Sequence, residues 1–169
     1  LVVATDGSGL HLTDARFRRC GHGISWGQNH PWNRKRPLLG PHQVVPRAEL
    51  RALLEAMRMT DKPLQVLVDC AFGVDGYHAL QKGEPLAHLD HQDLWEQVKE
   101  AAAAGGHDRV EVVKVKAHTA LRDVHRGFIS MGHRWCNEKV DNFAKEVAAQ
   151  HPTPELVLKA AAKRRRTTI

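Results

Sequence analysis

The sequence has 169 residues and a formal net charge of +6, from 25 lysines and arginines against 19 aspartates and glutamates. This length suits one domain with its own hydrophobic core, and no apolar run approaches the length that spans a membrane. The three cysteines form no CxxC pair, which argues against a disulfide scaffold or a cysteine-rich zinc site. We therefore expect a reducing, intracellular location, cytoplasmic or nuclear.

The first part of the chain is predicted to be β-structure. Residues 1–5 (LVVAT) form an apolar strand that should stop at the turn-forming residues 6–9 (DGSG). A second strand is predicted over residues 22–26, between glycines. Residues 27–37 read as a polar loop, and residues 38–45 as a weak third strand interrupted by a Gly-Pro pair.

From Pro46 onward the apolar period changes to that of a helix, with apolar residues at i, i+3, i+4 and i+7. The later elements are predicted as a strand at 64–68, helices at 71–82 and from an Asp90 N-cap to 105, a strand at 110–115 and a final helix around 140–148. This order predicts an α/β domain with a mixed sheet covered by helices.

The positive charge is concentrated at the C-terminal end. Residues 151–169 carry +4 of the net charge and residues 1–150 only +2. We expect residues 1–150 to form the domain and residues 151–169 to be a basic tail or short helix. A basic sequence suggests a nucleic-acid partner only weakly when the charge lies in such a tail.

Four acidic residues stand where acids are costly. Asp6 and Asp69 directly follow apolar strands, and Glu49 and Asp141 lie at the margins of apolar helical stripes. In one crevice these carboxylates would repel one another and raise one another's pKa values. Mg²⁺ or Mn²⁺ would relieve the repulsion, and an ion pair ~3.5–4 Å apart performs phosphoryl transfer. Taken singly, each acid is more often a turn former, a helix cap or a solvated flank than a metal ligand, and only the combination of all four favours a metal site.

Six short motifs occur in a meaningful order along the chain. They are residues 5–8 (TDGS), 47–50 (RAEL), 68–70 (VDC), 93–95 (DLW), 115–119 (VKAHT) and 137–141 (NEKVD). In these motifs and their spacing the sequence resembles a type 1 ribonuclease H domain, found as a free enzyme or attached to retroelement reverse transcriptases. The resemblance runs from Thr5 to about Ala149. Two departures are Cys70, where the family usually has Ser, and Ala117, where it usually has Gly.

The resemblance implies the RNase H-like fold, with a five-stranded mixed sheet of three antiparallel and then two parallel strands. It implies hydrolysis of the RNA strand of RNA/DNA hybrids, leaving 5′-phosphate and 3′-hydroxyl ends. Asp6, Glu49, Asp69 and Asp141 would bind two Mg²⁺ ions, for which Mn²⁺ could substitute. Asp6 would bridge both ions, and His118 would assist proton movement or product release.

Substrate contacts are also implied by the resemblance. The candidates are Gly7, Ser8, Gly9, Gln43, Arg47, Cys70 and Ala71. Residues 44–46 (VVP) and Ala71 replace polar residues that are common in the family, so more of the contacts would come from the backbone. Further candidates for phosphate contacts, with a solvated basic surface as the alternative, are Arg16, Arg18, Arg19 and residues 34–36.

A basic loop that grips the DNA strand in some members is missing here. Residues 74–93, the corresponding region, have a net charge of −3. Because phosphate contacts supply much of nucleic-acid affinity, we expect weak hybrid binding by the isolated domain. Nanomolar affinity in low salt would contradict this. Such weak binding is typical of a monomeric domain tethered to a reverse transcriptase, and the lack of an initiator Met agrees with that origin.

Two other functions remain to be weighed. A non-catalytic hybrid-binding module on the same fold is disfavoured because all four carboxylates are present. A DNA-acting nuclease or integrase is disfavoured by the R-x-E-L and V-K-x-H-T motifs.

Overall fold

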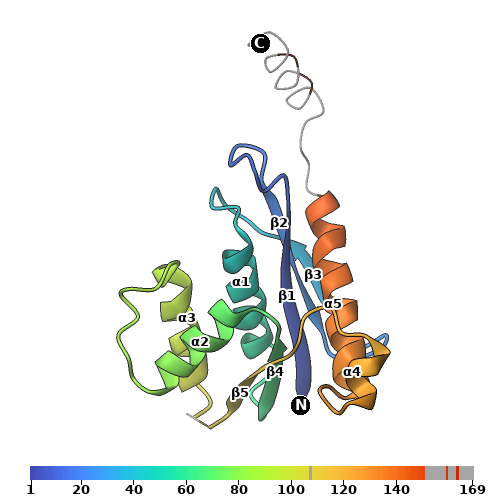
Figure 1. Ribbon diagram of the computed structural model, residues 1–169. Helices are drawn as coiled ribbons and strands as arrows, with labels where there is room; N and C mark the ends of the chain where they lie inside the picture. The colour runs from blue at the N-terminus through green and yellow to red at the C-terminus, as the bar shows by residue number, and fades with distance from the viewer. Residues whose placement is uncertain (107, 151–158, 160–162, 164–169) are drawn as a thin grey trace.

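The structure, a computed structural model, describes residues 1–106, 108–150, 159 and 163. Within these residues five strands form one sheet in the order β3-β2-β1-β4-β5 (Figure 1). The strands are β1 (Val2–Leu10), β2 (Arg19–Ser25), β3 (Arg34–Pro37), β4 (Leu64–Val68) and β5 (Val110–Lys114). β1, β2 and β3 pair antiparallel, whereas β4 and β5 run parallel to β1. The predicted α/β class and five-stranded mixed sheet are confirmed. The predicted tail, residues 151–169, lies outside the described residues except at 159 and 163.

Helices cover both faces of the sheet (Figure 1). The helices are α1 (Val45–Arg58), α2 (Ala71–Gln81) and α3 (Gln92–Ala103) on one face, and α4 (Leu121–His125) and α5 (Met131–Gln150) on the other. Successive strand residues point to opposite faces, so Val3 joins the core under α1 while Ala4 joins the core under α5. In the described part of the chain, no helix has the length and apolarity needed to cross a membrane.

Two glycines of β2 let α5 lie close to the sheet. A Cβ added at Gly21 would come 2.4 Å from Cγ2 of Val147, and one at Gly23 would come 2.8 Å from Cβ of Phe143. Any side chain at these positions would push α5 away from β2. The close approach fixes the position of α5, the helix that carries Asp141.

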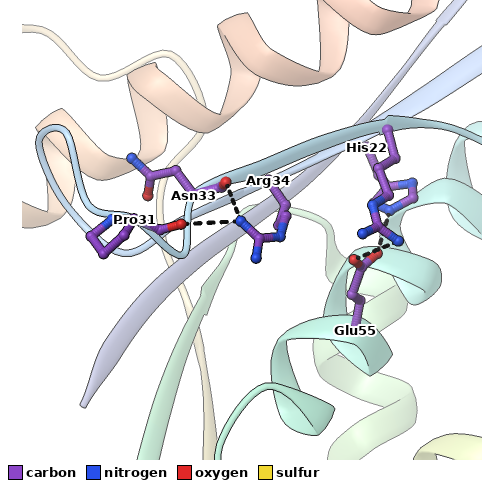
Figure 2. A network of polar contacts seen from close by, with 6 residues as sticks. His22, Pro31, Asn33, Arg34 and Glu55 are labelled. Carbon is purple, nitrogen blue, oxygen red and sulfur yellow. Dashed lines mark hydrogen bonds and ion pairs between the residues drawn. The ribbon is translucent and has the colours of Figure 1, made fainter.

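Glu55 of α1 ties the outer strands to the helix (Figure 2). Its Oε2 lies 3.0 Å from Nε2 of the buried His22, and its Oε1 lies 3.3 Å from Nη1 of Arg36. The hydrogen bond with His22 lowers the pKa of Glu55, and the charges of His22 and Arg36 act in the same direction. Beside this network, Arg34 donates to the carbonyls of Pro31 and Asn33 (Figure 2). The basic residues of β3 are therefore engaged within the protein.

The β-strand predictions were wrong in two places. Residues 6–9 were expected to be a turn, yet β1 continues through them, and Asp6 to Gly9 pair in register with residues 20–23 of β2. The third strand was expected at 38–45, but β3 lies in the segment read as a loop. β3 is an edge strand with charged, largely exposed residues, and such a strand lacks the apolar pattern used to recognise strands.

The helix predictions were wrong at two boundaries. The predicted N-cap Asp90 is not the cap: α3 begins at Gln92, and His91 occupies the cap position with φ +66°. The five-residue α4 was not predicted, and α5 begins at Met131, well before the apolar stripe that starts at Val140. The first turns of α5 are only half-buried or exposed, so their sequence carries little helical period.

Candidate active site

The strand register brings Asp6 and Asp69 together. β4 ends at Val68, which pairs with Thr5 of β1, so the next residue of each strand is an aspartate. Beyond this point β1 continues to Leu10 with β2 as its partner. The two carboxylates therefore lie side by side where β4 leaves the sheet, although the sequence had suggested strand ends for both.

The first turn of α1 adds Glu49 to this pair. α1 lies against β1 at Gly7, where an added Cβ would stand 2.7 Å from the backbone nitrogen of Glu49. Gly7 is thus required for the approach of the helix. The carboxylate oxygens of Asp6, Glu49 and Asp69 lie within 4.8 Å of one another.

Burial and mutual repulsion make this cluster costly when it is ionised. Burial, followed by the charge of Asp69, raises the pKa of Asp6 to about 7. Burial and the neighbouring Asp6 raise the pKa of Glu49 well above its ordinary value. Burial also raises the pKa of Asp69, and a hydrogen bond with Asn137 opposes this rise. These directions are those expected of carboxylates crowded into a poorly solvated site.

The donor set fits a divalent cation. Oε2 of Glu49 is buried and has no hydrogen-bond partner in the described part of the chain. None of the described lysines or arginines pairs with Asp6, Glu49 or Asp69. Hard oxygen ligands with uncompensated negative charge are what Mg²⁺ and Mn²⁺ bind in proteins.

Asp141 lies beside the cluster rather than inside it. It lines a groove of about 250 Å³ together with Asp69, His118, Thr119, Arg134, Asn137 and Glu138. Its charge contributes to the raised pKa values of Asp6 and Asp69, so it lies near them. Oδ2 of Asp141 accepts a hydrogen bond from Nζ of Lys145 at 2.6 Å. The structure thus brings three predicted ligands together and holds the fourth in an ion pair at the groove.

His118 is exposed on the connection that follows β5, at the same groove. Its backbone is left-handed, with φ +49°. The buried Asp123 binds both sides of this turn, since Oδ1 accepts from Nζ of Lys116 at 2.8 Å and Oδ2 accepts from the Ala120 N–H at 2.7 Å. Asp123 therefore fixes the turn that carries His118.

Asn137 and Asp123 were not singled out as site residues from the sequence. For Asn137 a signal existed, because it opens the NEKVD motif, and its buried side chain bonds Asp69. For Asp123 there was none, because its partners are visible only once α4 and the turn before it are in place.

Two predicted substrate contacts have structural roles in the folded chain. The buried Gln43 accepts a hydrogen bond from the Cys20 N–H, and its amide donates to the carbonyls of Leu38 and Gly40. Arg47 makes a bidentate ion pair with Asp93 at 2.7 and 2.5 Å. The side chains of Gln43 and Arg47 are thus occupied in holding the loop before α1 and in joining α1 to α3.

The other predicted substrate contacts lie near the carboxylates. Ser8 and Gly9 continue β1 beyond Asp6 and are half-buried. Cys70 is the half-buried N-cap residue of α2, and Ala71 is the exposed first residue of that helix. These four residues remain candidates, with Gly7 serving first to seat α1.

Most of the predicted phosphate-binding cations already have protein partners. The charged partners are Asp14 for Arg16, Glu146 for Lys35 and Glu55 for Arg36. Arg18, Arg19 and Arg34 donate to backbone carbonyls. Arg16, Lys35 and Arg36 remain exposed to solvent, so their phosphate contacts stay a prediction beside the alternative of a solvated basic surface.

The sheet order and the acid cluster define an α/β domain of the RNase H-like class. A sequence model of the RNase H family, described as RNase H, matches residues 1–149, and the chain belongs to this family. Membership supports an RNase H-type hydrolase acting on RNA/DNA hybrids. No curated protein matches the chain.

Solved structures share the fold at low sequence identity. The solution structure of the PFV RNase H domain is 21% identical, with a TM-score of 0.64 over 88% of this chain and 93% of that one. A foamy viral protease-reverse transcriptase in complex with RNA/DNA hybrid is 17% identical, with a TM-score of 0.62 over 87% of this chain and 20% of that one. LC9-RNase H1, described as a type 1 RNase H with the type 2 active-site motif, is 21% identical, with a TM-score of 0.58 over 90% and 74%.

Proposed function

We propose that the protein is an endoribonuclease that hydrolyses the RNA strand of RNA/DNA hybrids with divalent cations. One observation carries this proposal: the oxygens of Asp6, Glu49 and Asp69 lie within 4.8 Å of one another, and no lysine or arginine among the described residues pairs with them. Family membership supports the hybrid as the substrate.

In this proposal Asp6, Glu49, Asp69 and Asp141 hold two Mg²⁺ ions, and Mn²⁺ can replace them. Bound ions would supply positive charge for the scissile phosphate and would lower the pKa of a bound water. Asp141, which now accepts a hydrogen bond from Lys145, would exchange this partner for an ion. Asn137 orients Asp69 through its hydrogen bond.

The exposed His118 would take up or deliver a proton near the reacting phosphate, because it lines the groove with Asp69 and Asp141. The RNA products would carry 5′-phosphate and 3′-hydroxyl ends. The 2′-hydroxyl groups of the RNA strand are the feature by which a protein tells a hybrid from duplex DNA.

The test is cleavage of a labelled RNA/DNA hybrid, duplex DNA and duplex RNA in Mg²⁺ or Mn²⁺. We expect cleavage of the hybrid RNA, reduced at least about 100-fold in Asp69→Asn. The matched control is Asp75→Asn, which changes an exposed acid of α2 and should leave the rate unchanged. Binding without cleavage would identify a non-catalytic module, and cleavage of duplex DNA alone would identify a DNA-acting nuclease. Equal activity of Asp69→Asn would refute the metal site.

We further propose that residues 1–150 form the nuclease domain and that it acts as a monomeric unit of a reverse transcriptase. The shared fold with the foamy viral protease-reverse transcriptase supports this origin. The mass of the native polypeptide tests it: a polypeptide that also contains a polymerase domain is expected, and a free 18.9 kDa protein would contradict it.

A further inference from the structure

The connection between β5 and α5 is one of two basic segments within residues 1–150. In residues 116–134 the cations Lys116, Arg122, Arg126 and Arg134 stand against Asp123, a net charge of +3. Residues 1–150 as a whole carry only +2, so the remainder of the body is slightly negative. Residues 16–36 carry +6, and residues 116–134 are the basic segment that lies beside the groove.

This segment is held firmly against the protein. Ile129 is buried at 7% exposure and packs with Val115 and Val140 under α5. Val124 of α4 packs against the same cluster, and Asp123 is hydrogen-bonded to the turn before α4. The exposed side chains of α4 are therefore presented from a fixed position.

Arg122 of α4 and Arg126, the C-cap residue of that helix, are exposed to solvent. Asp123 is buried and Val124 half-buried, whereas Arg122, His125 and Arg126 are exposed. Positions i, i+3 and i+4 share one face of a helix. In the described part of the chain, the side chains of Arg122 and Arg126 form no hydrogen bond or ion pair. In this respect they differ from Lys116, Arg134 and Lys145 near the groove, which form ion pairs with acidic side chains.

Both ends of the segment reach the catalytic groove. His118 and Thr119, just before α4, line the groove, as does Arg134, at the end of the segment. Nε of Arg134 donates to the Thr119 carbonyl at 3.1 Å, which joins the two ends. Figure 1 shows α4 beside the first turns of α5. α4, which begins at Leu121, therefore lies next to the groove.

We propose that Arg122 and Arg126 bind phosphate groups of the nucleic-acid backbone beyond the groove; that the nucleic acid is an RNA/DNA hybrid rests on the proposed function. A guanidinium group matches phosphate in charge and in its paired hydrogen-bond geometry. The free arginines and their nearness to the groove favour this partner. The same segment also exposes Leu121, Phe128 and Met131, so a protein partner is the alternative outcome.

The test compares Arg122→Ala/Arg126→Ala with the control Lys82→Ala/Lys99→Ala, which removes two exposed, unpaired cations from the other side of the sheet. Hybrid binding by the full chain is measured by fluorescence anisotropy in EDTA across a NaCl series. We expect the arginine variant to bind about tenfold more weakly in low salt and to lose about 2 from the slope of log K against log salt. In the control variant the slope should fall by less than half as much as in the arginine variant. In Arg122→Lys/Arg126→Lys the slope should stay close to that of wild type.

The outcomes separate this proposal from the proposed function. Equal slopes in the arginine variant and in wild type, with unchanged KM in hybrid cleavage, would overturn the α4 proposal while leaving the nuclease intact. If the wild-type protein cleaves no hybrid, the proposed nuclease function is refuted. A salt slope that is reduced only in the arginine variant would still support phosphate binding by Arg122 and Arg126 in that case. Intact hybrid binding with lost binding to a purified polymerase domain would overturn the proposal in favour of a protein partner. Thermal unfolding checks that both double variants fold.

Discussion

Replacing Asp6 by Asn should stabilise the metal-free protein. The pKa of Asp6 is raised from 3.8 to about 7, chiefly by burial. When the pKa of a carboxyl group is higher in the folded state than in the unfolded state, protonation of that group stabilises the folded protein. Its contribution is fully present below pH 3.8 and is lost as the pH rises through about 7. Metal-free wild type should therefore lose stability between these values.

The size of the effect follows from the same shift. A pKa rise of this size corresponds to about 4 kcal/mol of lost stability above pH 7. Because Glu49 and Asp69 remain in the variant and share the repulsion, we expect Asp6→Asn to gain about 2–4 kcal/mol. The amide oxygen of Asn can keep the hydrogen bond that Oδ1 of Asp6 accepts from the Gly7 N–H. For a domain of this size the gain corresponds to about 5–10 °C in the unfolding midpoint.

The assay is urea and thermal unfolding in EDTA, from acidic to mildly alkaline pH, for wild type, Asp6→Asn and the control Asp75→Asn. The variant should show a flatter pH dependence and exceed wild type most at alkaline pH. Added Mg²⁺ should stabilise wild type far more than the variant, because binding to the folded state alone adds stability. A variant that is less stable than wild type above pH 7, or that keeps the wild-type pH dependence, would refute the reasoning.

Three further variants probe residues around the site. Asp123→Asn should reduce the hybrid cleavage rate about tenfold with hybrid affinity unchanged, because it weakens the hold on the turn that carries His118; an unchanged rate would contradict this positioning role. His118→Ala should lower the single-turnover cleavage rate about 10- to 100-fold without changing binding, and a loss in affinity alone would argue against a proton-transfer role. Glu55→Gln should cost about 1 kcal/mol near neutral pH. Because the pKa of Glu55 is lowered by His22, this contribution is present above pH 4.5 and is lost as the pH falls through the lower folded-state value. The difference from wild type should vanish in acid urea titrations, and a difference that grows there would contradict the assignment.

Local patterns were enough to predict the class of fold. The stripe of Leu50, Leu53, Leu54 and Met57 predicted α1, and all four side chains are at most 2% exposed. The run at 64–68 predicted β4 with its observed bounds. β3 escaped prediction because an edge strand tolerates charged residues, and α4 because five residues are too few for an apolar period.

The site was predicted in part for a similar reason. Strands and helical stripes pointed to Asp6, Glu49 and Asp69, and the fold brings these three together. The ion pair that holds Asp141 at the groove depends on Lys145, one turn later on α5, and could not be read from the motif. The roles of Gln43 and Asp123 were hidden because the positions of their partners, mostly backbone groups, are determined only by the fold.

The ends of the RNA fragments test the central claim most directly. A hybrid with uniformly labelled RNA is incubated with the protein in Mg²⁺ and in EDTA, and the fragment ends are identified by mass spectrometry. Metal-dependent hydrolysis through the acid cluster predicts 5′-phosphate and 3′-hydroxyl ends in Mg²⁺ and intact RNA in EDTA. Fragments with 2′,3′-cyclic phosphate ends, or cleavage that continues in EDTA, would contradict it.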